Sequence, residues 1–161
     1  MRLFVAIPLS EEMKNALVGA MHDLKKQGVE GNYVPVQNLH MTLAFIGEYE
    51  DPGRIKEILR SVPFPEFRMA LTEKGNFGNV LWAGVRGNQK LQSYVKDLRT
   101  ALKENGIPCA DDRFVPHITL VRKARARMPY QIRLPKCGMT AKEASLMQSV
   151  PRGNSVLYKI M

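Results

Sequence analysis

The sequence predicts an α+β fold in which a strand-helix-strand unit occurs twice. Two stretches carry this prediction: His40-Met-Thr-Leu and His117-Ile-Thr-Leu each place a histidine and a threonine two residues apart in an apolar, strand-like run. Each stretch follows a long amphipathic helix pattern, and the distance from helix start to histidine is nearly equal, from residue 11 to 40 and from residue 89 to 117. Such self-similarity indicates duplication, and two equal lobes joined face to face would aim both strands at one groove.

The elements expected in the first half follow from local signals. Pro8 ends an apolar run that predicts a buried strand, Ser10 can cap the following helix, and Gly28 closes that helix. The pair Asp51-Pro52 combines a capping residue with a favoured first helical residue. The expected elements are a strand at residues 2–8, a helix from residue 11, an extended segment at 33–36, the first His-Thr strand at 39–46, a helix from 52 to about 60, and a strand at 67–73.

The second half repeats this order after a turn-rich stretch, Gly75-Asn-Phe-Gly78, which is the expected boundary between lobes of about residues 1–76 and 77–161. Asn88 can cap the second long helix, and Asn105-Gly106 ends it. The expected elements are a strand at residues 80–85, this helix, the second His-Thr strand at 115–122, an irregular basic connector at 123–136, and a C-terminal hairpin of residues 144–150 and 155–160 that closes the sheet. Residues 1–161 are expected to form a single domain.

Composition and charge limit the class of protein. At 161 residues and 45% hydrophobic content the chain can bury a core, and no apolar run approaches the ~20 residues that span a bilayer. We expect a cytoplasmic protein with reduced thiols at Cys109 and Cys137 and no membrane association. The formal charge is +9, and the segment from Arg113 to Lys142 holds eight basic residues and no acidic one. This segment encloses the second His-Thr pair, so it favours an anionic ligand such as nucleic acid over a merely solvated face.

Paired histidines and threonines suit the chemistry of a phosphodiester. Side chains alternate along a strand, so His40 and Thr42 share one face, as do His117 and Thr119. A neutral imidazole can accept a proton from a nucleophile while a protonated one donates to the leaving group, and the two hydroxyls can donate to the non-bridging oxygens. The sequence has no His-x-His, no His-Glu-x-x-His and no glycine-rich phosphate loop, so neither a metal nor a cofactor is expected.

The stretches Val34 to Gly47, Val80 to Gly84 and Arg113 to Arg122 together resemble the two-histidine phosphoesterases, specifically the RNA 2′,3′-cyclic phosphodiesterases long named 2′-5′ RNA ligases. The resemblance implies a bilobal fold with pseudo-twofold symmetry, antiparallel sheets around a central groove, and metal-independent hydrolysis. It assigns His40 as proton donor and His117 as proton acceptor, with Thr42 and Thr119 binding the phosphate.

The resemblance further assigns nucleotide contacts to the residues five positions after each histidine, Phe45 and Arg122. Strict alternation would point both side chains away from the histidine face, so this assignment requires a bend in each strand. Core packing for Phe45 and a solvated rim for Arg122 are the alternatives.

The leading hypothesis is a monomeric enzyme that opens RNA 2′,3′-cyclic phosphodiester ends to 2′-phosphomonoesters, with reversible 2′-5′ ligation as the opposite direction. One alternative keeps the chemistry but acts on small cyclic nucleotides or 2′-5′ oligoadenylate. Another is a non-catalytic module that binds RNA ends. The residues alone do not rank the two histidines, because the two motifs are nearly identical.

Overall fold

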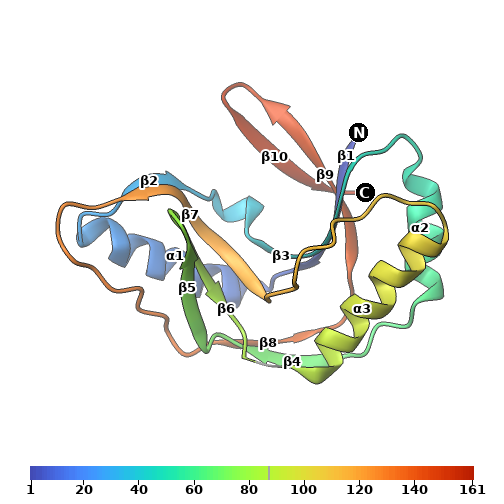
Figure 1. Ribbon diagram of the computed structural model, residues 1–161. Helices are drawn as coiled ribbons and strands as arrows, with labels where there is room; N and C mark the ends of the chain where they lie inside the picture. Colours follow the sequence, from blue (N-terminus) through green and yellow to red (C-terminus); the bar gives the residue numbers. More distant parts are fainter. Residues whose placement is uncertain (87) are drawn as a thin grey trace.

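The computed structural model describes residues 1–86 and 88–161 (Figure 1). Within these residues the strands form two four-stranded sheets, ordered β10-β9-β1-β3 and β2-β7-β6-β5, and a two-stranded sheet of β4 and β8. Every one of these pairings is antiparallel, which confirms the α+β expectation. The elements are β1 (Arg2–Pro8), α1 (Glu11–Lys26), β2 (Glu30–Tyr33), a 3₁₀ turn (Val36–Asn38), β3 (His40–Glu48), α2 (Pro52–Ser61), β4 (Phe67–Ala70), β5 (Glu73–Phe77), β6 (Val80–Gly84), α3 (Gln89–Glu104), β7 (His117–Arg125), β8 (Gly138–Ala141), β9 (Ser145–Arg152) and β10 (Ser155–Ile160).

The duplication is visible in the strand register. In the first unit β1 pairs with β3, and Pro8, the last residue of β1, lies opposite His40. In the second unit β6 pairs with β7, and Gly84, the last residue of β6, lies opposite His117. Each histidine therefore begins its strand at the same place relative to the strand before the long helix. The expected strand-helix-strand repeat is confirmed as β1-α1-β3 and β6-α3-β7.

The two lobes do not follow the predicted division at residues 76 and 77. The C-terminal strands β9 and β10 join the sheet of β1 and β3, whereas β2 from the first half joins the sheet of β7. The long helices also cross over, because α1 packs against β7 and α3 packs against β3 (Figure 1). The reason is that β1 and β7 each have an edge left open by their own unit, and each edge is satisfied by a strand from the other half of the sequence.

The helices begin where the sequence predicts. Ser10, Asp51 and Asn88 cap α1, α2 and α3, and each side chain accepts a hydrogen bond from the backbone N–H three residues later, at 3.1, 3.3 and 3.1 Å. Each such cap contributes about 1 kcal/mol to stability. The buried stripe of α1 has the predicted spacing, and it lies against one core that both lobes share. No helix of residues 1–86 and 88–161 is both long and apolar enough to cross a membrane.

Residues 67–77 differ from the prediction. In place of one strand followed by a turn they form β4 and β5, and the turn begins only at Gly78. Gly75 lies inside β5 because the Trp82 indole covers it: a Cβ there would be 2.6 Å from Cζ2 of the tryptophan. This glycine therefore makes room for an aromatic ring and does not mark a turn. The short strand β8, which pairs with β4, was not predicted.

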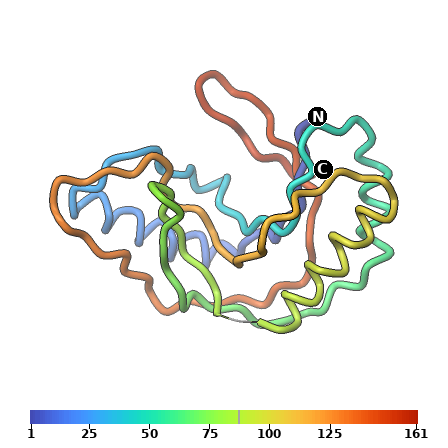
Figure 2. Tube along the Cα trace, viewed as in Figure 1, coloured from blue at the N-terminus to red at the C-terminus, as the bar shows by residue number. Residues whose placement is uncertain are grey.

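The C-terminal hairpin is confirmed, since β9 pairs with both β10 and β1. The basic connector is only partly irregular, because β7 continues to Arg125 before the chain loses regular structure. From there it runs around one end of the molecule and returns beneath the sheets to β8 (Figure 2). The hairpin stands over the central strands on the opposite side from β4 and β8 (Figure 1).

Candidate active site

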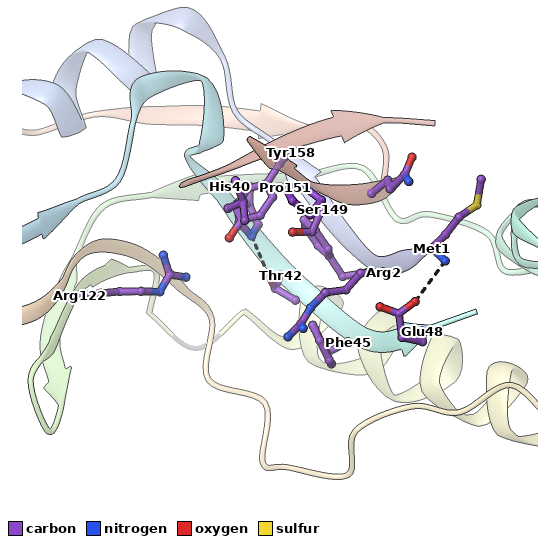
Figure 3. A pocket seen from close by; sticks show the side chains of 13 residues that line it. Met1, Arg2, His40, Thr42, Phe45, Glu48, Arg122, Ser149, Pro151 and Tyr158 are labelled. Carbon is purple, nitrogen blue, oxygen red and sulfur yellow. Dashed lines mark hydrogen bonds and ion pairs between the residues drawn. The ribbon is translucent and has the colours of Figure 1, made fainter. Parts of the chain in front are cut away.

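The two histidine strands lie against each other, so both motifs meet in the middle of the molecule. His40 and Thr42 line a groove of about 750 Å³ that is walled on one side by the β9–β10 hairpin (Figure 3). His117 lines a smaller hollow of about 120 Å³, to which Thr42 and Phe45 also contribute. The two hollows thus share a wall, and the structure brings together the histidines that the sequence singled out.

The two imidazoles are oriented in the same way. Nδ1 of His40 lies 2.6 Å from the carbonyl oxygen of Asn38, and Nδ1 of His117 lies 2.7 Å from the carbonyl oxygen of Val115. Because a carbonyl can only accept, each Nδ1 carries the hydrogen in this bond. The neutral tautomer is therefore the same in both rings. Nε2 is the nitrogen left to exchange a proton in each case.

The threonines differ between the two motifs. The Thr42 hydroxyl lies 2.8 Å from Nε2 of His40, and it donates to this nitrogen when the ring is neutral. Thr119 is half-buried on the same strand as His117, but within the described residues its hydroxyl forms no such bond. It lines neither hollow. Thr42 therefore both lines the groove and bonds its histidine.

A bulge in each strand supplies the bend that Phe45 and Arg122 need. In the β1–β3 ladder, Val5 pairs with Ala44 and Ala6 with Thr42, so Leu43 is the extra residue. In the β6–β7 ladder the register shifts at the equivalent place, and Leu120 is skipped. A bulge puts one additional residue on a strand and reverses the alternation beyond it. As a result Phe45 and Arg122 come to the side of the histidines and are both exposed.

Each of these two side chains lines a hollow that contains the histidine of the other motif. Arg122 of the second motif lines the groove with His40 of the first, and Figure 3 shows it reaching toward His40 and Thr42. Phe45 of the first motif lines the hollow that holds His117. The guanidinium of Arg2 lies 5.4 Å from the centre of the Phe45 ring, which adds a second cation to the groove of His40. Each motif thus completes the surroundings of the other motif's histidine.

Aromatic rings surround both histidines, and sequence reasoning missed most of them. His40 contacts Phe4 and Tyr158, each with ring centres 5.0 Å away, and Tyr158 meets it edge-on. On the other side, His117 contacts Phe77 at 5.1 Å and Trp82 at 5.9 Å. These rings come from strands distant in sequence, and only the sheet order brings them to the histidines. They limit how far each imidazole can turn.

Asn38 ties the hairpin to His40. It is 3% exposed, and its amide Nδ2 donates to the Val156 carbonyl at 2.8 Å while its Oδ1 accepts from the Tyr158 N–H at 3.1 Å. The same residue's main-chain carbonyl accepts from His40. One buried residue thus fixes both the imidazole and the strand whose tyrosine covers it. Val115, whose carbonyl accepts from His117 in the equivalent way, has no side-chain amide for this purpose.

The surroundings of His40 shift its pKa. Burial lowers the pKa of His40 below its ordinary value of about 6.5, and the hydrogen bond to the Asn38 carbonyl opposes this by favouring the charged form. The positive Arg122 and a charged His117 nearby lower the pKa further. In the free protein, His40 is therefore held toward its neutral form.

No group of three or more metal-ligating side chains occurs in residues 1–86 and 88–161. Beside His40 the groove presents hydroxyl and guanidinium groups, which suit an anionic ligand, and its one carboxylate among the described residues, on Glu48, is paired with the N-terminal ammonium at 3.2 Å. Two imidazoles on matching strands of a duplicated α+β fold, each with a threonine two residues later, are the arrangement of the two-histidine phosphoesterases.

Comparison with known proteins agrees with this class. Residues 13–147 match the family model described as the 2′-5′ RNA ligase superfamily. A Thermotoga maritima protein named RNA 2′,3′-cyclic phosphodiesterase is 33% identical over 132 residues, which are 76% of this chain and 70% of that protein. An Escherichia coli K12 protein of the same name is 32% identical over 130 residues, 76% of this chain and 72% of its own length.

Solved structures show the same fold. E. coli LigT complexed with 3′-AMP superposes with a TM-score of 0.86 at 26% identity, covering 99% of this chain and 94% of that one. A Thermus thermophilus protein, TT0787, superposes with a TM-score of 0.77 at 28% identity, covering 100% and 95%. The chain belongs to the 2′-5′ RNA ligase superfamily.

Proposed function

We propose that this protein hydrolyses the 2′,3′-cyclic phosphodiester at the end of an RNA, leaving a 2′-phosphomonoester, and that the same site can run in reverse to form a 2′-5′ linkage. The observation that carries the proposal is the matched pair of imidazoles, each with Nδ1 bonded to a backbone carbonyl, which leaves Nε2 as the nitrogen that exchanges a proton. The names of the relatives support the substrate class.

The histidines divide the proton transfers. Neutral His117 accepts a proton from water through Nε2 as the water oxygen attacks phosphorus. The bond from phosphorus to the 3′ oxygen breaks, and protonated His40 gives its Nε2 proton to that oxygen. The products are a 2′-phosphate and a free 3′-hydroxyl, and solvent returns the proton from His117 to His40. This order of roles rests on the family resemblance.

The remaining groups hold the phosphate. The Thr42 hydroxyl, now 2.8 Å from Nε2 of His40, would turn to a non-bridging oxygen when substrate enters between them. The family resemblance gives Thr119, on the same strand face as His117, the corresponding role. Arg122 and Phe45 at the groove would contact the nucleotide, one through charge and the other through its ring. We further propose that the protein acts as a monomeric single domain in the cytoplasm.

The decisive experiment gives the purified protein an oligonucleotide ending in a 2′,3′-cyclic phosphate and determines which hydroxyl carries the phosphate afterwards. A 2′-phosphate supports the reaction and its polarity, whereas a 3′-phosphate reverses the assigned roles. An intact end that still binds would favour a binding module. Faster turnover of a cyclic mononucleotide than of the oligonucleotide would move the substrate to the small cyclic nucleotides.

Activity is expected to survive chelation. The imidazoles supply the acid and the base, and the hydroxyl and guanidinium groups bind the anion, so the proposed steps require no metal ion. The measurement is turnover after dialysis against EDTA, compared with the same protein dialysed against buffer. Loss of turnover that returns on adding one divalent cation would show that the proposed mechanism is incomplete.

A longer RNA should bind more tightly than a cyclic mononucleotide, and this advantage should shrink as salt concentration rises. Arg125 and Arg133 of the basic connector pair with Glu30 and Asp23 at 3.1 and 3.4 Å, while Arg122 lies at the groove. Arg122 and the connector's other basic side chains would release counterions when they contact backbone phosphates of a longer RNA. Titrating both ligands at several salt concentrations tests this. If the affinity depends on neither RNA length nor salt concentration, the basic connector is only a solvated face.

A further inference from the structure

The outer edges of β3 and β7 have different hydrogen-bond partners. β3 is the last strand of its sheet, so its outward carbonyls have no neighbouring strand, whereas β7 has β2 on its outer side. At the bulge of β7, the Leu120 carbonyl accepts from the Val34 backbone N–H at 2.9 Å. At the equivalent bulge of β3, the Leu43 carbonyl accepts from Nε of Arg99 at 3.0 Å. A side chain of α3 thus replaces a missing strand.

Arg99 also reaches the segment that leads into His117. Its Nη1 donates to the Asp112 carbonyl at 2.7 Å, and its guanidinium lies 5.8 Å from the Phe114 ring. The Ala110 N–H donates to the Phe45 carbonyl at 3.0 Å, which adds a second link between this segment and β3. Val115, three residues after Asp112, holds Nδ1 of His117. Arg99 therefore links the strand that carries His40 to the segment that precedes His117.

The environment of Arg99 favours a positioning function over a purely stabilising one. Its side chain is 15% exposed, and its nearest carboxylate oxygen, on Asp112, is 3.9 Å away. Burying a guanidinium that has no close carboxylate partner lowers the stability of the folded protein. An apolar residue of similar size often gives a fold that is equally stable. The same hollow contains His117, Thr42 and Phe45 alongside Arg99, so the bonds it makes lie next to the reacting groups.

We propose that Arg99 is a positioning residue that sets the placement of His117 relative to His40 by bonding the β3 bulge and the segment before β7 at once. It does not touch the reacting atoms. It fixes the two backbones whose separation determines whether both Nε2 atoms can reach one phosphorus. This inference rests on the proposed function for its kinetic readout.

The test compares Arg99→Met with Lys103→Met. Lys103 lies one turn further along α3 and pairs with Asp111 of the same segment, but among the described residues it makes no hydrogen bond to β3. Arg99→Met should lower kcat about 10- to 100-fold, the cost of a misplacement of about 1 Å, while KM changes less than about threefold. Lys103→Met should leave both constants near those of the unchanged protein.

Three more measurements keep the result unambiguous. Arg99→Lys can bond only one of the two carbonyls well and should fall between the others, and millimolar guanidinium should partly restore an Arg99→Ala variant. The His117 ring signals in an NMR spectrum should shift in Arg99→Met while those of exposed His22 stay in place, and this readout needs no turnover. If the unchanged protein shows no turnover, the proposed function fails while the NMR comparison still tests Arg99. Equal losses in Arg99→Met and Lys103→Met, or a kcat that is unchanged, would overturn the inference.

Discussion

Replacing either His40 or His117 with alanine is expected to lower kcat by at least about 10²-fold, the usual contribution of a general acid or base. The two losses should be similar in size, since each ring performs one of two proton transfers in the same step. Both rings are half-buried at the start of a strand whose ladder bonds come from the backbone, so the variants should remain folded. The measurement is single-turnover hydrolysis of a cyclic-ended oligonucleotide, with the circular dichroism of each variant.

The third histidine provides the matched control. His22 is exposed on α1 and contributes to neither hollow, so His22→Ala should keep the activity of the unchanged protein. The double variant of His40 and His117 should lose little beyond either single variant, because the two residues act as one unit. Near-normal turnover in either single variant would disprove the paired mechanism.

The sequence predicted the repeat well because the signals that define it are local. Caps at Ser10, Asp51 and Asn88, and apolar spacing between them, depend only on neighbours within a turn of helix. The histidine and threonine spacing is local as well, so each motif could be assigned to a strand directly, although the second strand begins at His117 and not at Val115 as predicted. The crossing of helices and strands between lobes could not, because it depends on which open sheet edge each strand meets.

The bulges show where alternation alone misleads. Each motif ends in two consecutive buried residues, Leu43-Ala44 and Leu120-Val121, followed by an exposed one. Such a pair of buried residues breaks the period of two at the bend that Phe45 and Arg122 require. The pattern becomes informative only because it occurs twice at the same place. A single apolar pair in a strand is ordinary.

The contacts that make the two histidines unequal come from tertiary structure. The hairpin covers only His40, and it is held there by a buried asparagine whose partners lie more than a hundred residues away. Nothing within the motif indicates this. The nearly identical tetrapeptides therefore carry the reaction type, while Asn38 and Tyr158 distinguish the surroundings of the two rings.

This difference leads to an expected pH dependence. In the free protein, burial lowers the pKa of His40, with the positive Arg122 and His117 acting in the same direction. A bound phosphate places negative charge beside the ring and favours its protonated form, so it raises the pKa of His40. If His40 is the proton donor, activity is lost as pH rises through that pKa. The alkaline limb of kcat, which reports the complex, should therefore lie at higher pH than the alkaline limb of kcat/KM, which reports the free protein.

The comparison needs both rate profiles between about pH 4 and 9, at a constant ionic strength so that Arg122 acts equally throughout. Each profile should be bell-shaped, and its limbs belong to the coupled pair. Titrating the His40 ring by NMR, with and without inorganic phosphate, gives the same shift independently of turnover, with His22 as an exposed reference in the same spectra. An upward shift of the His40 pKa on phosphate binding together with an upward shift of the alkaline limb is the result expected if His40 is the donor. Alkaline limbs that coincide, while the His40 ring still shifts, would contradict the donor role of His40.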